Sequence, residues 1–366
     1  MKLHTICSLF AFLFFSQICF SQITVDDLEI KKMITEIKAE SLENTVKKLV
    51  SFGTRHTLSD TKSKTRGIGA AQQWVKSEFD KYALESNGRL TSKIDYFTIK
   101  ADGRRIAVDS QLGNVMATLK GTDSTDDRVL IISGHLDSRV TDVMDAKSDA
   151  PGANDDGSGV AAMMELAKIM SKRSFPYTIH FVAVTGEEQG LYGSRHLAEL
   201  AKEENWNIVA MLNNDMIGNS LSSGTNLRDN TKVRVFSEAT PYLETEEEGK
   251  MRKLTNRDND SPSRLLARYI KTTTDQYVDQ LEVNLVYRND RFLRGGDHTP
   301  FSQNGFTAIR FCEMNENYDH QHQDLRTENA IKYGDLPEFM DFEYLRKIAA
   351  SNLATLANLA WAPIAP

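Results

Sequence analysis

The sequence contains few cysteines, with 3 among its 366 residues. Two of them, Cys7 and Cys19, lie in an N-terminal segment that has the pattern of a cleaved leader, so the mature chain would keep Cys312 alone. A single cysteine cannot form an intramolecular disulfide. The stability of the mature chain must therefore come from its hydrophobic core and from any bound metal.

The leader is predicted over residues 1–21. Lys2 precedes an apolar region that runs from Ile6 to Phe15, and a short polar end follows near Ser21. This apolar region is too short to span a bilayer comfortably. We therefore expect cleavage of the leader, a secreted or periplasmic location, and no membrane span in the mature chain.

The sequence also shows no internal repeat, no low-complexity tract and no clear linker. Its net charge of −7 argues against nucleic acid as a partner. With 40% hydrophobic and 26% charged residues, the composition is that of an ordinary globular protein. We expect one domain over residues 22–366, beginning with an amphipathic helical extension over residues 22–50.

Strand and helix patterns alternate from residue 129 onward, which predicts an α/β fold with a mixed, largely parallel central sheet and helices on both faces. Residues 219–262 have a weaker pattern, and within them EATPYLETEEEGK and TNRDNDSPS have the composition of solvated loops. The other strands are expected over residues 91–100, 113–120, 129–135, 178–185, 208–214, 281–286 and 307–311. The helices are expected over residues 67–82, 158–172, 190–203, 263–277 and 341–361.

Acidic and imidazole side chains stand where several of these strands end. The carboxyl ends of strands in an open α/β sheet line the crevice in which such sheets bind ligands. So many acids at close range would repel one another unless cations were present. Imidazole together with carboxylate suits zinc better than magnesium or calcium. The candidate ligands are His135, Asp155, Glu188, Asp215 and His320.

Six motifs make this prediction more specific. They are, in order, GHLDS, PGANDDGSG, TGEEQGLYGS, NNDMIG, GGDHTPF and YDHQHQD. In this order and at these intervals they resemble the co-catalytic zinc exopeptidase family, which includes bacterial leucyl aminopeptidases, aminopeptidase Y and glutaminyl cyclases. The resemblance covers the chain from about residue 51 to the C-terminus. It implies a phosphorylase/hydrolase-like fold, two zinc ions and peptide substrates.

The resemblance also assigns roles to the candidate ligands. His135 and Asp215 would hold one zinc ion, and Glu188 and His320 the other, with Asp155 bridging the two. The carboxylate of Asp137 would orient the His135 imidazole. A cis peptide bond would follow the bridging acid.

Glu187 resembles the general base of the family, which takes a proton from metal-activated water. Adjacent side chains generally point in different directions, so Glu188 can face the metal while Glu187 faces the water. Asp297, His298 and Tyr318 match positions beside the family's site. They would contact the substrate or support the metal ligands.

The last ligand is where this chain departs from the family's pattern. The family usually has an aromatic residue followed by His and, four residues after the His, an Asp, whereas here an extra residue separates Tyr318 from the first histidine. Counting back four from Asp324 selects His320, and His322 is the alternative.

The leading function is a secreted zinc aminopeptidase that removes N-terminal residues from peptides. Glutaminyl-peptide cyclotransferase activity is one alternative, and a non-catalytic binding module with the same fold is another. The chain runs directly from Glu188 through QGLYGSRHLA without the longer insertion of the animal cyclases, which favours hydrolysis.

Overall fold

A computed structural model describes residues 25–290 and 295–363 of the chain. Its central sheet has eight strands: β1 (Leu90–Ile99), β2 (Ser110–Leu119), β3 (Arg128–His135), β4 (Thr178–Val184), β5 (Asn207–Asn214), β6 (Lys232–Phe236), β7 (Glu282–Val286) and β8 (Ala308–Glu313). Their order across the sheet is β1-β2-β4-β3-β5-β8-β6-β7.

The middle of this sheet is parallel. Strands β4, β3, β5 and β8 run in the same direction, whereas β1 and β2 pair antiparallel at one edge and β6 pairs antiparallel with β8. The expected mixed, largely parallel sheet is confirmed, and so is the strand pair that flanks it. The central strands are rich in Val, Ile and Leu because both of their faces are covered.

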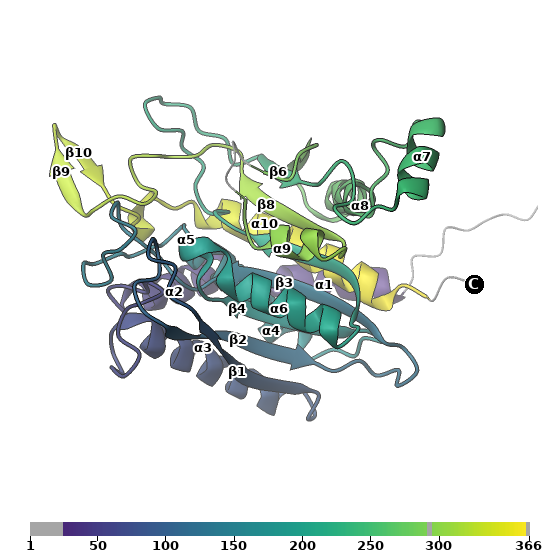
Figure 1. Cartoon of the computed structure of the whole chain (residues 1–366), viewed down its shortest axis with the longest axis horizontal. Helices are drawn as coiled ribbons and strands as arrows, with labels where there is room; N and C mark the ends of the chain where they lie inside the picture. The colour runs from purple at the N-terminus through teal and green to yellow at the C-terminus, as the bar shows by residue number, and fades with distance from the viewer. Residues whose placement is uncertain (1–24, 291–294, 364–366) are drawn as a thin grey trace, which may run out of the picture.

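Helices cover both faces of the sheet (Figure 1). The larger layer consists of α1 (Val25–Glu36), α2 (Ala39–Val50), α3 (Gly67–Leu84), α4 (Gly157–Met170), α8 (Pro262–Tyr277) and α10 (Phe342–Trp361). The smaller layer consists of α6 (Tyr192–Glu203) and α9 (His298–Gln303). In the part of the chain that the structure describes, no helix combines the length and apolar character that crossing a bilayer requires.

The N-terminal extension forms two helices, as its periodicity predicts. Helix α2 buries Leu42, Val46 and Leu49 and packs against α4 and α10, so the extension contributes to the main core. The predicted leader at residues 1–21 lies outside the described residues.

Two elements within residues 219–262 were not predicted, and the second of them begins inside the loop expected at EATPYLETEEEGK. Strand β6 lies between β8 and β7 and buries Val233 and Val235. Helix α7 (Glu246–Leu254) follows, starting with a reciprocal capping box between Thr245 and Glu248. Five short elements were also not predicted. They are the helices α5 (Glu187–Gly190) and α9, the strands β9 (Arg326–Glu328) and β10 (Ile331–Tyr333), which project together from the body (Figure 1), and the 3₁₀ turn Pro337–Phe339.

Candidate metal centre

Three neighbouring strands bring the predicted site together. His135 is the last residue of β3, Asp215 directly follows β5, and Glu187 and Glu188 open the short helix α5 (Glu187–Gly190) just after β4. Because β4, β3 and β5 are adjacent and parallel, their carboxyl ends lie at the same edge of the sheet. Asp155 reaches this edge from the loop between β3 and α4.

Two glycines allow the elements to approach this closely. A Cβ atom on Gly134 of β3 would lie 2.5 Å from the main-chain nitrogen of Val160 in α4. A Cβ on Gly159 would lie 2.4 Å from the carbonyl oxygen of Asn214. These distances are too short for any side chain, so the glycines let the first turn of α4 sit against β3 and β5.

Asp155 is at the centre of the cluster. Its Oδ1 lies 3.0 Å from Nε2 of His135, and its Oδ2 lies 3.0 Å from Nε2 of His322. Nε2 of His322 also lies 2.8 Å from Oε1 of Glu188, and Nε2 of His135 lies 3.9 Å from Oδ1 of Asp215. Among the described residues, two groups that could each hold a metal ion share Asp155: His135–Asp155–Asp215 and Asp155–Glu188–His322. A third such group is His135–Glu187–Glu188.

The structure does not bring His320, the expected ligand, into this cluster. The ring of His320 stacks on Phe339, with ring centroids 3.8 Å apart, instead of meeting the carboxylates. His322, the alternative, supplies the imidazole. The turn over residues 319–322 explains the difference, because His322 has a positive φ of 55° that redirects the chain and brings its side chain to Glu188.

Asp137 acts differently from the expectation. Nδ1 of His135 lies 3.0 Å from the carbonyl oxygen of Asp137, so the main chain, not the carboxylate, receives the imidazole N–H. The Asp137 carboxylate accepts hydrogen bonds from the amides of Gly186, Glu187 and Glu188 and from the hydroxyl of Thr57. It therefore fixes the turn that presents the two glutamates.

The predicted cis peptide bond between Asp155 and Asp156 is present. Asp335 holds the chain on one side of it, because its carboxylate accepts hydrogen bonds from the amides of Asn154 and Asp155 at 2.7–3.0 Å. On the other side, Asp156 caps α4 through the amide of Gly159 and accepts the amide of His135. These hydrogen bonds fix the main chain on both sides of Asp155 and so position its side chain.

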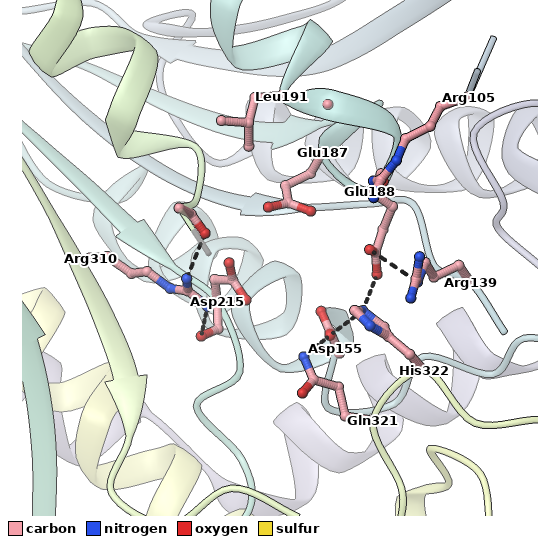
Figure 2. A pocket seen from close by; sticks show the side chains of 12 residues that line it. Arg105, Arg139, Asp155, Glu187, Glu188, Leu191, Asp215, Arg310, Gln321 and His322 are labelled. Atoms are coloured by element: carbon pink, nitrogen blue, oxygen red, sulfur yellow. Dashed lines mark hydrogen bonds and ion pairs between the residues drawn. The ribbon is translucent and has the colours of Figure 1, made fainter. Parts of the chain in front are cut away.

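The two adjacent glutamates are separated as expected. The Glu188 carboxylate turns toward His322, whereas the Glu187 carboxylate projects into the pocket between Glu188 and Asp215 (Figure 2). Burial raises the pKa of Glu187 well above its ordinary value, and the nearby carboxylates of Asp215 and Glu188 add to the rise, against the opposing effect of His135.

The other pKa values show how strongly these charges interact. Burial disfavours the charged imidazoles, but Glu188 and Asp155 raise the pKa of His322 to about 9, and Glu187 and Asp155 raise that of His135 well above its ordinary value. Burial likewise opposes ionisation of Asp155, yet His322 and His135 hold its pKa well below the usual range. In the protein without metal, the two protonated imidazoles thus balance the negative charge of the carboxylates.

The cluster opens into a pocket of about 480 Å³. Its charged walls are mixed: the acids are Asp155, Glu187, Glu188 and Asp215, and the bases are Arg105, Arg139, Arg310 and His322. The arginines were not predicted as site residues, because each stands outside the six motifs. Gln321 was not predicted either, although it lies within YDHQHQD. Arg310 forms an ion pair with Asp215 at 2.8 Å and donates to the carbonyl of Gly295 at 2.8 Å.

The remaining predicted residues lie around this pocket. Asp297 and His298 are fully buried and are not among the residues lining it. Nε2 of His298 is 2.8 Å from the carbonyl of Asn289, and burial lowers the His298 pKa to about 4, so its ring is neutral. Tyr318 is 52% exposed and stands outside the lining residues.

The fold is shared with solved structures. The aminopeptidase LapA of Legionella pneumophila superposes with a TM-score of 0.64 at 20% identity, over 99% of this chain and 81% of that protein. A glutaminyl cyclase of Fimbriiglobus ruber superposes with a TM-score of 0.58 at 16% identity, over 88% of this chain and 95% of that protein. Both similarities define the fold class.

Sequence similarity identifies the family. The family model described as peptidase family M28 matches residues 114–342. A probable zinc metalloprotease of Leptosphaeria maculans is 48% identical over 338 residues, which cover 92% of this chain and 78% of that protein. The chain belongs to peptidase family M28. The predicted resemblance to the zinc exopeptidases is confirmed.

Proposed function

We propose that this protein is a zinc-dependent aminopeptidase with two metal ions. The observation that carries the proposal is the position of Asp155, whose two carboxylate oxygens face two different imidazoles. One ion would be held by His135, Asp155 and Asp215. The other would be held by Asp155, Glu188 and His322.

The chemistry of these donors fits zinc. Imidazole nitrogen and carboxylate oxygen are common zinc ligands, whereas magnesium and calcium favour sites made of oxygen alone. The three carboxylates Asp155, Glu188 and Asp215 supply three negative charges toward the four positive charges of two zinc ions. When bound, zinc would acidify a water molecule and polarise the peptide carbonyl.

Glu187 would move the proton. Its carboxylate projects into the pocket from the first turn of α5, and the hydrogen bonds of Asp137 fix the main chain beneath it (Figure 2). It accepts a proton from the attacking water and then donates that proton to the amine that leaves, so the carboxylate ends each cycle unchanged. Glu188 on the same turn stays with the metal ligands.

Removal of N-terminal residues, instead of internal cleavage, fits the charge of the pocket. Its wall carries Glu187, a carboxylate that is not a proposed metal ligand, and negative charge there favours a substrate with a free α-ammonium group. The proposed activity agrees with the fold that this chain shares with the Legionella aminopeptidase.

The proposal is tested with aminoacyl-anilides and with peptides that are free or N-acetylated. We expect about two zinc ions per chain, hydrolysis of the free substrates and no hydrolysis of the acetylated ones. Glu187→Gln should keep its zinc and lose activity by about 10²- to 10⁴-fold. Glu246→Gln on the exposed helix α7 is the matched control and should behave as the wild type.

Three results would contradict this function. Absence of zinc after dialysis would support a binding module. Cleavage of acetylated peptides would indicate another peptidase activity. Ammonia release from glutaminyl peptides without peptide-bond hydrolysis would indicate a cyclotransferase.

We also propose that the protein is exported, on the basis of residues 1–21. N-terminal sequencing of the mature protein after expression in its natural host should find the leader removed. A mature protein that retains residue 1 and stays inside the cell would contradict export.

A further inference from the structure

Two arginines in the pocket wall have no assigned role in this chemistry. Figure 2 shows Arg139 and Arg105 on the side of Glu188, across the pocket from the Arg310–Asp215 ion pair. If Asp155, Glu188 and Asp215 are taken up by cations, as the proposed function requires, Glu187 is the one acid left among the charged lining residues named above. Arg105 and Arg139 then make the Glu188 side of the pocket positive, whereas Glu187 keeps a negative charge in the same pocket.

Arg139 is placed to receive an anion. It follows β3 by four residues, and its side chain is 17% exposed. Its Nε lies 3.6 Å from Oε2 of Glu188, beyond hydrogen-bond distance, and finds no acceptor among the described residues although it is buried. A buried donor without an acceptor is destabilising, and a ligand oxygen at this position would accept its hydrogen bond.

Arg105 stands on a loop that hydrogen bonds to Asp102 hold in place. The carboxylate of Asp102 accepts the amides of Arg104, Arg105 and Ile106, and the Tyr192 hydroxyl donates to the same carboxylate. Ile106 is fully buried, which anchors the loop to the body. From this position Nη1 of Arg105 donates to the carbonyl of Glu188 at 2.6 Å, leaving its other donors at the pocket wall.

We infer that Arg139 and Arg105 bind a carboxylate of the substrate close to the scissile bond. A guanidinium offers two parallel N–H groups that match the two oxygens of a carboxylate. This carboxylate could belong to an acidic N-terminal residue or to the C-terminus of a very short peptide. Either source gives the same chemistry: a zwitterionic substrate whose ammonium group meets the acids and whose carboxylate meets the arginines.

The test compares substrates that differ by one charge, and it rests on the proposed peptidase function. Aspartyl- and asparaginyl-anilides form the first pair, and alanyl-glycine and its C-terminal amide form the second. In at least one pair the wild type should prefer the acid by about tenfold or more in kcat/KM. The pair that shows the preference identifies the source of the carboxylate.

Variants then assign the preference to the arginines. In Arg139→Gln the acid-to-amide ratio should fall toward one, mainly through KM, and Arg139→Lys should restore part of it. Arg105→Gln should lower the ratio as well. Arg104→Gln is the matched control, because Arg104 is exposed on the same loop and does not line the pocket.

A second measurement does not depend on turnover. Calorimetric titration of zinc-loaded Glu187→Gln with an uncleaved acidic peptide and its amide should show the same preference, and adding Arg139→Gln should remove it. Acid-to-amide ratios near one in the wild type, or a preference that survives both glutamine variants, would overturn the inference while leaving the peptidase intact. Failure to hydrolyse any of the four substrates would instead contradict the proposed function.

Discussion

Replacing His322 by asparagine tests which imidazole serves the metal. His322 has a φ of 55°, a left-handed conformation that asparagine adopts more readily than most residues, so the substitution should remove the ring and preserve the main chain. The natural comparison is His320→Ala, two positions away. It removes a ring that stacks on Phe339 at a tilt of 12° and leaves the carboxylates untouched.

The two substitutions should affect the free energy of unfolding differently: one through zinc binding and the other independently of zinc. With zinc at about 100 times its dissociation constant, binding stabilises the wild type by about 2.7 kcal/mol. If loss of the His322 ligand weakens binding about 100-fold, the same zinc concentration stabilises His322→Asn by about 0.4 kcal/mol. His320→Ala should lose about 1 kcal/mol from the aromatic contact, equally with and without zinc.

Urea unfolding with zinc and with chelator measures both effects, and anilide hydrolysis follows activity in the same samples. For each variant, the free energy of unfolding with zinc is compared with that of the same variant with chelator. The destabilisation from leaving Asp155 and Glu188 without their imidazole partner cancels in this difference. The reasoning would be refuted if His320→Ala lost its stabilisation by zinc while His322→Asn retained it.

Three further changes test the support of the site. Arg55→Met should lose about 3 kcal/mol or more in urea unfolding, because buried Arg55 donates to three main-chain carbonyls; a loss below about 1 kcal/mol would contradict this. Asp137→Asn places an amide N–H₂ group opposite main-chain N–H donors, so kcat/KM should fall about 10- to 100-fold. Near-UV circular dichroism should show an intact fold, and unchanged kinetics would argue against the turn-fixing role. Burial lowers the pKa of His180 to about 4 in the folded protein. As the pH falls from 6.5 toward 4, the unfolded chain binds a proton at this histidine and the folded protein does not, so the free energy of unfolding falls by about 3 kcal/mol. The wild type should therefore lose more stability than His180→Gln between pH 7.5 and 4.5, and equal losses in urea unfolding would exclude this cause.

The fold was largely predictable because its central strands are buried on both faces. The four consecutive apolar residues 129–132 of β3 are a clear strand signal, and a helix with a full apolar stripe such as α10 is equally clear. Strand β6 was missed because Arg234 interrupts a strand of five residues inside a polar region. Its identity as a strand comes from hydrogen bonds to β7 and β8, which are distant in the sequence.

The site was predictable where a side chain stands at a strand end, as His135 and Asp215 do. The choice between His320 and His322 depends on the direction of a turn, which a count of residues does not specify. Asp137 was placed in the right location, but the sequence could not show whether its carbonyl or its carboxylate meets the imidazole. The arginines at positions 105 and 139 were missed because tertiary contacts alone bring them to the pocket.

Glu188 and His322 are 134 positions apart, yet they share one hydrogen bond. During synthesis the glutamate leaves the ribosome long before the histidine does. The growing polypeptide therefore carries an incomplete set of ligands until most of its length has emerged and the late segment has docked. Under the proposed function, hydrolytic capacity is acquired near the end of folding, and partly made chains pose little danger to the proteins around them.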